Sequence, residues 1–213
     1  MGFPILSLLT FLPLVGVFFL AFIIRGDQEF VERNAKHTAL FVSLFVFILS
    51  LMLLFEFDKS DAGFQFVESY EWISLWGMNF TLGVDGISLF FVVLAGFLTP
   101  ICIIASWRSI KTRVKEYMVA FLILETFMMG TFLAMDAFLF YIFFEGVLLP
   151  MFFIIGIWGG VRRVYSSYKL FLYTLLGSVL MLLAVLTLYY QVGTSSIPDL
   201  IASPVAANLQ MWL

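Results

Sequence analysis

The sequence predicts an all-α integral membrane protein with six transmembrane helices. Of its 213 residues, 63% are hydrophobic and 12% are charged, against about 45–50% and about 25% in soluble globular proteins. So few charged side chains could not cover the surface of a water-soluble domain of this length. Most of the chain is therefore expected to have lipid as its solvent.

Six apolar runs have the length of a membrane span. A helix that rises about 1.5 Å per residue needs about 20 apolar residues to cross about 30 Å of hydrocarbon. We interpret the first run as a permanent span rather than a signal peptide, because no Lys or Arg precedes it and its apolar core exceeds the usual ~7–15 residues. The runs cover residues 3–24, 39–55, 86–107, 117–135, 138–158 and 170–190.

The distribution of cations predicts how the chain is oriented. The chain holds 11 Lys and Arg residues, and all except Lys59 lie in the connections that follow the first, third and fifth spans or at their edges. Basic connections stay on the inner side of a membrane. Both termini are therefore predicted on the outer side, in the periplasm or the intermembrane space. The inner cations are Arg25, Arg33, Lys36, Arg108, Lys111, Arg113, Lys115, Arg162, Arg163 and Lys169.

The spans and their connections divide the chain into five parts. The outer loop is rich in acids and aromatic residues, and Trp72 and Trp76 are expected to anchor it at the membrane interface. Asp85 at its end is predicted to cap the next helix. Apolar residues return near residue 209, which predicts a chain cut or split just before another membrane helix; an interfacial segment is the alternative. The parts are 1–58 with helices one and two, 59–84 with the outer loop, 85–116 with helix three and a basic inner loop, 117–192 with helices four to six, and 193–213 with an outer connection toward a missing helix.

Several classes of function are excluded by what the sequence lacks. A single cysteine, Cys102, cannot form a disulfide framework or a four-thiolate iron–sulfur site, and a single histidine, His37, cannot supply both ligands of a bis-histidine haem. No glycine-rich nucleotide-binding motif is present. A formal charge of -3 gives no reason to expect nucleic acid. The chain is therefore predicted to carry no cofactor of its own and no metal.

Two of the fourteen acidic residues, Glu125 and Glu145, lie inside the predicted spans. A carboxyl group in the membrane is costly, so it indicates function by default, and proton relays are built from such groups. The predicted topology puts both within about one helical turn of the same depth, on an antiparallel hairpin of helices where they could face each other. Glu145 is the main candidate for proton translocation and Glu125 a weaker one.

The residues around Glu145 strengthen its candidacy. Tyr141 is four residues earlier, on the same helix face, and is a weaker proton-path candidate. Pro150 removes the backbone hydrogen bond to the carbonyl of Gly146, so that a helix kink and water entry are predicted beside the acid. The alternative is a protonated Glu145 that hydrogen bonds a neighbouring helix only for packing.

Two other charged residues receive simpler interpretations. Asp136, between the fourth and fifth spans, is expected to be a solvated turn acid. Lys169 is expected to extend its ammonium group to the lipid headgroups; it could be a relay cation only if the sixth span begins earlier than residue 170. Gly159 and Gly160 are expected to end the fifth helix.

Five segments closely resemble the proton-pumping, antiporter-like subunit family of respiratory complex I, called subunit M in bacteria and NADH dehydrogenase subunit 4 in mitochondria. The resemblance extends over nearly the whole chain, and the Phe-Phe-Glu sequence is its most specific part. The segments are Leu82-Gly-Val-Asp-Gly-Ile-Ser-Leu89, Phe97-Leu-Thr-Pro-Ile-Cys-Ile-Ile-Ala-Ser-Trp107, Lys115-Glu-Tyr-Met118, Phe143-Phe-Glu-Gly-Val-Leu-Leu-Pro-Met-Phe-Phe-Ile-Ile-Gly-Ile-Trp-Gly159 and Phe171-Leu-Tyr-Thr-Leu-Leu-Gly-Ser178.

The resemblance implies a membrane-arm subunit of NADH:quinone oxidoreductase that helps to translocate protons as electrons pass from NADH to quinone. Such subunits contain two inverted helical repeats, each with one broken helix. Glu145 matches the essential glutamate of the fifth helix, which modulates a lysine on the broken seventh helix. That lysine and the later residues of the path do not occur in this sequence. The chain thus resembles the N-terminal portion of such a subunit and is not expected to pump protons alone.

The resemblance also implies partners and a location. NADH, FMN, iron–sulfur clusters and quinone are expected in partner subunits. The expected neighbours are other complex I subunits, above all antiporter-like ones, a chain or segment that supplies the missing C-terminal helices, and membrane lipids. The location implied is the bacterial inner membrane or the mitochondrial inner membrane. The alternatives are a subunit of a multisubunit cation/proton antiporter and a membrane scaffold that transports nothing.

Overall fold

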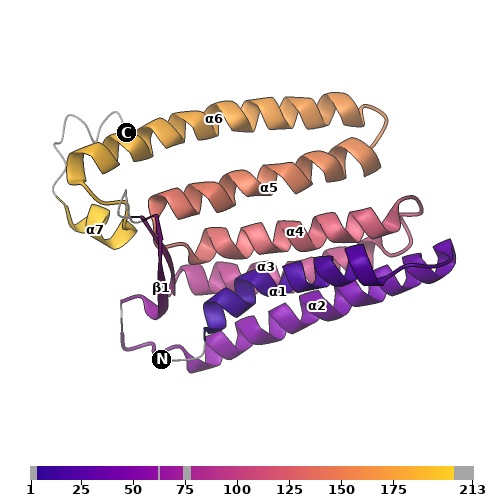
Figure 1. The fold of residues 1–213 in the computed structure, drawn as a ribbon, viewed down its shortest axis with the longest axis horizontal. Helices are drawn as coiled ribbons and strands as arrows, with labels where there is room; N and C mark the ends of the chain where they lie inside the picture. Colours follow the sequence, from indigo (N-terminus) through magenta and orange to yellow (C-terminus); the bar gives the residue numbers. More distant parts are fainter. Residues whose placement is uncertain (1–3, 62, 74–77, 204–213) are drawn as a thin grey trace.

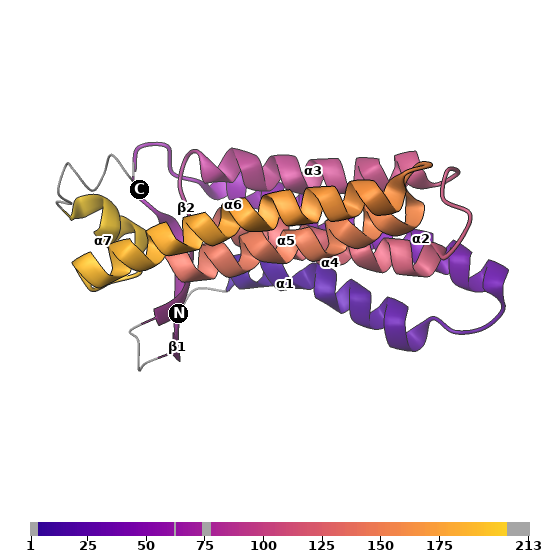
Figure 2. The ribbon, with the colours of Figure 1, turned by 90° about the horizontal axis from the view of Figure 1, so that it is seen from above.

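The structure is a computed structural model that describes residues 4–61, 63–73 and 78–203. Six of its helices are long and apolar enough to cross a membrane, as predicted, and they run side by side in alternating directions (Figures 1 and 2). The helices are α1 Ile5–Phe18, which continues as the π-helical turn η1 Phe19–Ile23, α2 Gln28–Glu56, α3 Ser88–Ser106, α4 Val114–Leu133, α5 Ala137–Trp158 and α6 Arg163–Val192.

The helices form a cluster of four with two more added in a row. Helix α4 packs on α1, α2 and α3, whereas α5 packs on α4, and α6 packs on α5 (Figure 1). Helix α6 buries only Ser167 and Ser178 among the described residues. The central position of α4 places its membrane carboxyl group inside the four-helix cluster, and the outlying position of α6 leaves one side of that helix open.

Two helices begin well before the apolar runs that predict them. Helix α2 begins at Gln28 rather than at residue 39, and α6 begins at Arg163 rather than at residue 170. Hydropathy identifies the residues that suit hydrocarbon, whereas the helical backbone continues into polar sequence beyond it. The first turns of α2 are fixed to the rest of the bundle, because the ammonium group of Lys36 donates to the carbonyl of Trp107 at 2.8 Å.

An antiparallel β-hairpin stands where the sequence predicts a loop, so the all-α prediction is wrong for this segment. Strand β1 spans Gln65–Ile73 and strand β2 spans Met78–Val84. In β2 the apolar side chains alternate with polar ones, which is the two-residue period of a strand with one buried face. Phe80 lies 6.0 Å from Phe11 of α1 and 6.5 Å from Phe143 of α5 between ring centroids. The hairpin therefore closes one end of the bundle.

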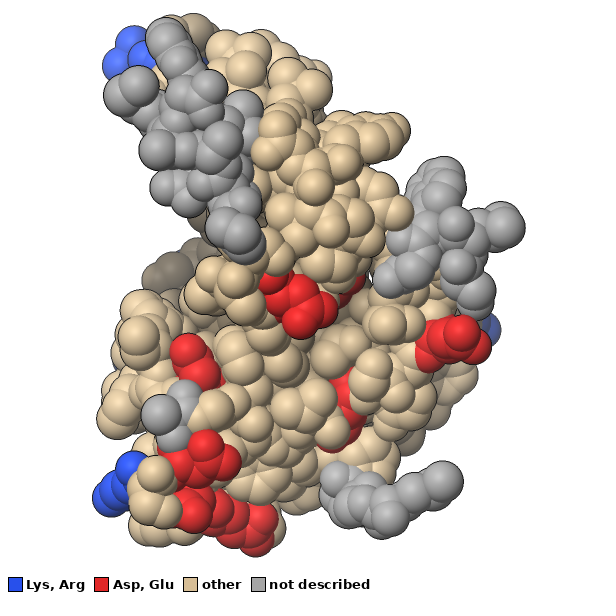
Figure 3. All heavy atoms as spheres, turned by 90° about the vertical axis from the view of Figure 1, so that its left-hand side faces the viewer, with Lys and Arg blue, Asp and Glu red and all other residues tan. Residues whose placement is uncertain are grey.

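We call this end the hairpin end and the opposite end, where the connections carry the cations, the basic end. Figure 3 looks at the hairpin end, where carboxylates outnumber the blue Lys and Arg side chains. The first residue of α1 and the last residue of α6 both lie at the hairpin end (Figure 1). Of the two tryptophans predicted as anchors, Trp72 in β1 is 47% exposed, and Trp76 lies outside the described residues, as do residues 204–213.

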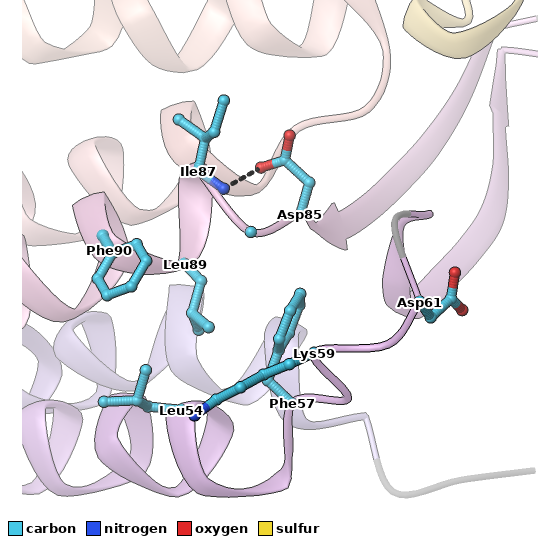
Figure 4. Close-up of a pocket in the computed structure, with 9 residues that line it drawn as sticks. Leu54, Phe57, Lys59, Asp61, Asp85, Ile87, Leu89 and Phe90 are labelled. Atoms are coloured by element: carbon cyan, nitrogen blue, oxygen red, sulfur yellow. Dashed lines mark hydrogen bonds between the residues drawn. The ribbon is translucent and has the colours of Figure 1, made fainter.

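Two predicted helix ends are confirmed. The Asp85 carboxylate accepts from the amides of Ile87 at 3.2 Å and Ser88 at 2.6 Å, as a cap of α3 does. Figure 4 shows this carboxylate at the rim of a cavity of about 500 Å³ between the end of α2 and the start of α3. Helix α5 ends at Trp158, directly before Gly159.

Candidate functional site

Glu145 lies on the face of α5 that packs against α6. Phe138 of α5 contacts Tyr189 of α6 with ring centroids 5.5 Å apart, and Phe152 contacts Phe171 at 5.4 Å. Glu145 is seven residues from each of these phenylalanines, about two helical turns, and therefore shares their face of the helix. The Glu145 side chain is placed midway along the seam between the two helices.

Ser178 is a buried residue of α6 near the level of Glu145. The two aromatic contacts fix an antiparallel register in which position 145 lies beside positions 178 to 182. Ser178 is 3% exposed, and its hydroxyl donates to the carbonyl of Leu175 in its own helix at 3.0 Å. The Oε2 atom of Glu145 is buried and has no hydrogen-bond partner within the described part of the chain. The seam thus holds a carboxyl oxygen whose hydrogen-bonding capacity is unused.

The two residues predicted to assist Glu145 flank it on α5. Tyr141 is partly buried one turn closer to the hairpin end, and no hydrogen bond joins its hydroxyl to Glu145 among the described residues. Pro150 is buried inside α5, which stays helical across it. Because proline has no N–H, the carbonyl of Gly146 lacks its helical donor next to the acid. The kink and the hydration at this point remain predictions.

A cavity approaches Glu145 from the hairpin end. Its volume is about 520 Å³, and it opens between the hairpin, α5 and α6. Ile142, which lines the cavity, is one turn from Glu145 on the same side of α5. The seam therefore widens within one helical turn of the carboxyl group. The lining residues are Trp72, Ile73, Met78, Phe138, Ile142, Leu186, Tyr189 and Tyr190.

Glu125 lies on the opposite face of α4 from α5. Helix α4 meets α5 through Phe127 and Gly130: a Cβ built on Gly146 would lie 2.4 Å from the Phe127 ring, and one built on Gly130 would lie 2.3 Å from Phe143. At about 100° per residue, Glu125 is turned about 140° to 200° away from these two positions. The same contacts offset Glu125 and Glu145 by about 4.5 Å along the helix axes. The two acids share a level but do not face each other.

Asp136 is not the solvated turn acid that the sequence suggests. It is 4% exposed, and its Oδ1 atom accepts from the amides of Phe138 at 2.9 Å and Leu139 at 3.0 Å, so it caps α5. Its Oδ2 atom accepts from the hydroxyl of Ser195, and the amide of Ala137 donates to the carbonyl of Ser195 at 2.8 Å. These bonds attach the start of α5 to the segment after α6. An acid directly before an apolar run is a helix-start signal that the sequence does contain.

Glu68 is a second carboxylate whose role the sequence does not reveal. Although it lies in β1, it accepts from the amides of Leu6 at 2.7 Å and Ser7 at 2.9 Å, and from the Ser7 hydroxyl. It thereby caps α1 from a position more than 60 residues away. No local pattern could indicate this contact, because the partners are joined only by the tertiary fold.

Lys169 does not pair with Glu145. Helix α6 does begin earlier than predicted, and Lys169 lies in its second turn, exposed near the basic end, with its ammonium group 6.0 Å from the Tyr165 ring centroid. The register places it nine to thirteen residues, about 14 to 20 Å, from the level of Glu145. Among the described residues, no group of three His, Cys, Asp or Glu side chains could hold a metal ion.

Two family models cover almost the whole chain. Residues 8–136 match the family described as NADH-ubiquinone oxidoreductase chain 4, amino terminus. The chain belongs to this family. Residues 134–213 match the family described as NADH:quinone oxidoreductase/Mrp antiporter, TM. The family predicted from the sequence motifs is confirmed.

Curated relatives extend well beyond this chain. It is 51% identical over 198 residues to NADH-quinone oxidoreductase subunit M of Rhodobacter capsulatus, covering 93% of this chain and 38% of the relative. It is 45% identical over 209 residues to NADH-ubiquinone oxidoreductase chain 4 of Arabidopsis thaliana, covering 98% and 41%. The chain thus spans about two-fifths of the length of these relatives.

Solved structures share the fold. A chain of respiratory complex I from Thermus thermophilus with bound NADH matches with a TM-score of 0.81 at 24% identity, covering 97% of this chain and 41% of that one. A chain of the Mrp complex from Dietzia sp. DQ12-45-1b matches with a TM-score of 0.78 at 17% identity, covering 93% and 21%. At these identities the likeness shows the fold alone.

Proposed function

We propose that this chain forms the N-terminal portion of a membrane-arm subunit of NADH:quinone oxidoreductase, and that it contributes to proton translocation coupled to electron transfer from NADH to quinone. Family membership carries this proposal, and the membrane carboxyl group in the α5–α6 seam supports it. The location proposed is an energy-coupling membrane, bacterial or mitochondrial, with the basic end on the inner side and both chain ends outside. NADH, FMN, iron–sulfur clusters and quinone belong to partner subunits in this proposal.

Glu145 is the proposed proton-carrying group. Its buried Oε2 atom has no partner among the described residues, so the acid is free to bind a proton or to accept a hydrogen bond from an incoming donor. A cation brought to about 4 Å would stabilise the ionised form by about 4 kcal/mol at an effective dielectric constant of ~20. Withdrawal of the cation would return the proton to the acid. Movement of such a cation would thereby load and unload Glu145.

The open side of α6 is where we propose that the remaining helices of the subunit pack. Helix α6 buries little of its surface in the described structure: Leu172 is 61% exposed, Tyr173 is 82% exposed and Leu176 is 67% exposed. The cationic partner of Glu145 and the neighbouring antiporter-like subunits are expected beyond this face. Tyr141 and Pro150 are proposed to assist Glu145, one with a hydroxyl group and the other with a loosened backbone.

Replacing Glu145 by Gln in the assembled native complex tests the proposal. The amide keeps the size of the side chain but cannot carry a proton, and positioned acid–base groups typically contribute about 10²-fold or more. We expect the protons translocated per NADH oxidised to fall, while NADH oxidation by a soluble electron acceptor persists. Glu71→Gln, an exposed change in β1, is the matched control and should change neither quantity.

Two outcomes would replace the proposal. Undiminished proton translocation by an intact Glu145→Gln complex would identify the chain as a scaffold at this site. A purified native assembly that contains no NADH-oxidising and no quinone-binding subunit would favour the alternative of a multisubunit cation/proton antiporter.

A further inference from the structure

Glu125 is the most completely buried ionisable residue in the described structure. Its side chain is 0% exposed, and both of its carboxyl oxygens lack a hydrogen-bond partner among the described residues. An ionised carboxylate in such a place would lose several kcal/mol of solvation without compensation. Even a neutral acid needs an acceptor for its O–H group. The four-helix cluster therefore contains a carboxyl group that needs a hydrogen-bond partner other than the described side chains.

The face of α4 that carries Glu125 packs against α1 and α3. On one side of Glu125, Leu122 lies 2.9 Å from the position of a Cβ built on Gly16 of α1. On the other side, Met129 lies 3.4 Å from the corresponding position on Gly96 of α3. Glu125 is three residues from Leu122 and four from Met129, so all three share one face of the helix.

Each of the two neighbouring helices has a buried proline at the level of Glu125. Helix α1 runs antiparallel to α4, so the Gly16–Leu122 contact places position 13 of α1 beside position 125. Helix α3 is also antiparallel to α4, and the Gly96–Met129 contact places position 100 of α3 beside position 125. Pro13 and Pro100 occupy these positions, and both are buried. Glu125 thus lies between two helices that each lack one backbone hydrogen bond at a proline.

Each proline releases one backbone acceptor. Proline has no N–H, so the carbonyls of Leu9 and Gly96, four residues earlier, lack their helical donors. Released carbonyls inside a membrane protein are satisfied by neighbouring helices, by Ser and Thr side chains, by ordered water or by a local change of helical geometry. Leu9 is 0% exposed, and Gly96 is buried. The same two contacts place Leu9 and Gly96 beside position 129 of α4, one helical turn toward the hairpin end from Glu125. Two carbonyls that lack their usual helical donors therefore lie within about one turn of an acid without partners.

The nearby hydroxyl groups are already engaged. The Thr10, Thr99 and Thr126 hydroxyls each donate to the carbonyl four residues earlier in their own helices, at 2.8, 3.0 and 3.2 Å. The Ser50 hydroxyl donates to Phe47 at 2.7 Å. None of these hydroxyl protons is directed at Glu125.

Charged groups do not face Glu125 from the described helices around it. Helix α1 has none, the charged residues of α2 lie in its first turns and at its last residue, and the titratable residue of α3, Cys102, is exposed. On α5, Glu145 faces the opposite way, toward α6. A buried salt bridge therefore does not account for the acid.

We propose that Glu125 and the carbonyls of Leu9 and Gly96 form an internal water-binding site, in which the acid is neutral and exchanges its proton through the bound water. The water donates to the released carbonyls and accepts from the carboxyl O–H group, which gives it the two to four polar partners that a buried water typically has. Exchange passes one proton from the carboxyl group to the water and returns another. The site is separate from the Glu145 seam and does not rest on the function proposed for it.

Infrared spectroscopy of the protein in its purified native assembly tests this site without relying on turnover. We expect a carbonyl-stretch band of a protonated carboxylic acid at neutral pH, which shifts when H₂O is replaced by D₂O. The band should disappear in Glu125→Gln and persist in Glu145→Gln. Absence of the band from the unaltered protein, or a band that never shifts in D₂O, would overturn the proposal.

Two proline variants keep the test informative if Glu125→Gln does not assemble. Pro13→Ala and Pro100→Ala leave the acid in place but restore the N–H groups that engage the carbonyls of Leu9 and Gly96. We expect each change to shift the Glu125 band, because the water then has one acceptor fewer. Leu200→Ala, in the short helix α7 Ile197–Ala202 at the hairpin end, is the control and should leave the band unchanged. An unshifted band in both proline variants would show that the released carbonyls take no part.

Discussion

Glu145 and Glu125 point to opposite sides of the α4–α5 pair. This orientation depends on two glycine–phenylalanine contacts between the helices. The Phe127 ring covers Gly146, and the Phe143 ring covers Gly130. A methyl group on Gly146 would lie 2.4 Å from two atoms of Phe127, much closer than the ~3.5–4.0 Å at which carbon atoms pack. Gly146→Ala therefore forces the ring or the whole helix to move.

The expected cost of Gly146→Ala is about 1–3 kcal/mol, the usual range for an overpacked core. Gly177 in α6 provides the matched control, because a Cβ there would meet nothing within 4 Å and the residue is also inside a helix. Gly177→Ala should be neutral or stabilising by up to about 1 kcal/mol through helix propensity. The assay is the thermal stability of the purified protein in detergent, with the amount assembled in membranes as a second readout.

A second substitution can restore the fit. Phe127→Leu removes the ring from above Gly146, so the double variant Gly146→Ala/Phe127→Leu should be more stable than the sum of the two single effects predicts. Equal stabilities of Gly146→Ala and Gly177→Ala would refute the packing argument. Strict additivity in the double variant would refute it as well, and the orientation derived for Glu145 would lose its basis.

Three further predictions concern carboxylates outside the membrane core. Asp136→Ala should lower stability by about 2–4 kcal/mol, because it removes both a helix cap and a charge-assisted hydrogen bond; proteolysis of the segment after α6 should become faster. Glu68→Ala should release the start of α1 at a cost of about 1–2 kcal/mol, seen as faster amide exchange there, whereas Glu71→Ala in the same strand should not. Hydrogen bonds from the Ser60 hydroxyl and amide lower the pKa of Asp58. They therefore stabilise the folded state above the unfolded-state pKa of Asp58, and this contribution is lost as pH falls through the lowered folded-state pKa. Ser60→Ala should therefore raise the pKa of Asp58, which NMR titration of its carboxyl carbon would report.

The spans could be predicted from the sequence because their signal is local and repeated many times over. Each run of about 20 apolar residues predicts its own membrane crossing, and each of the six runs corresponds to a long apolar helix in the structure. The polar first turns of α2 and α6 could not be found this way, because hydropathy does not measure helicity. Strand β2 is different: its alternation of Met78, Phe80, Leu82 and Val84 with smaller or polar residues is a strand signal that the acidic composition of the surrounding loop obscured.

The candidate acids were identifiable, but their surroundings were not. A carboxyl group in an apolar run is visible in the sequence, as is a proline four or five residues away. Which helix an acid faces depends on rotation about the helix axis, and the contacts that set this rotation join residues far apart in the chain. The local sequence therefore singled out Pro150 beside Glu145, whereas Pro13 and Pro100 became relevant to Glu125 only once α1, α3 and α4 were packed together.

The opposite orientations of the two acids predict that they act independently. Packed helices lie about 8–10 Å apart, and because both side chains point away from the shared α4–α5 contact, their carboxyl groups are on the order of 15 Å apart. At an effective dielectric constant of ~20 two charges at this distance interact by about 1 kcal/mol, against about 4 kcal/mol at 4 Å. Glu145→Gln should consequently leave the Glu125 infrared band unshifted, and any losses of proton translocation in the two Gln variants should combine independently. A band that moves with Glu145, or a double variant no worse than the poorer single one, would show that a single proton path connects the two acids across the α4–α5 contact.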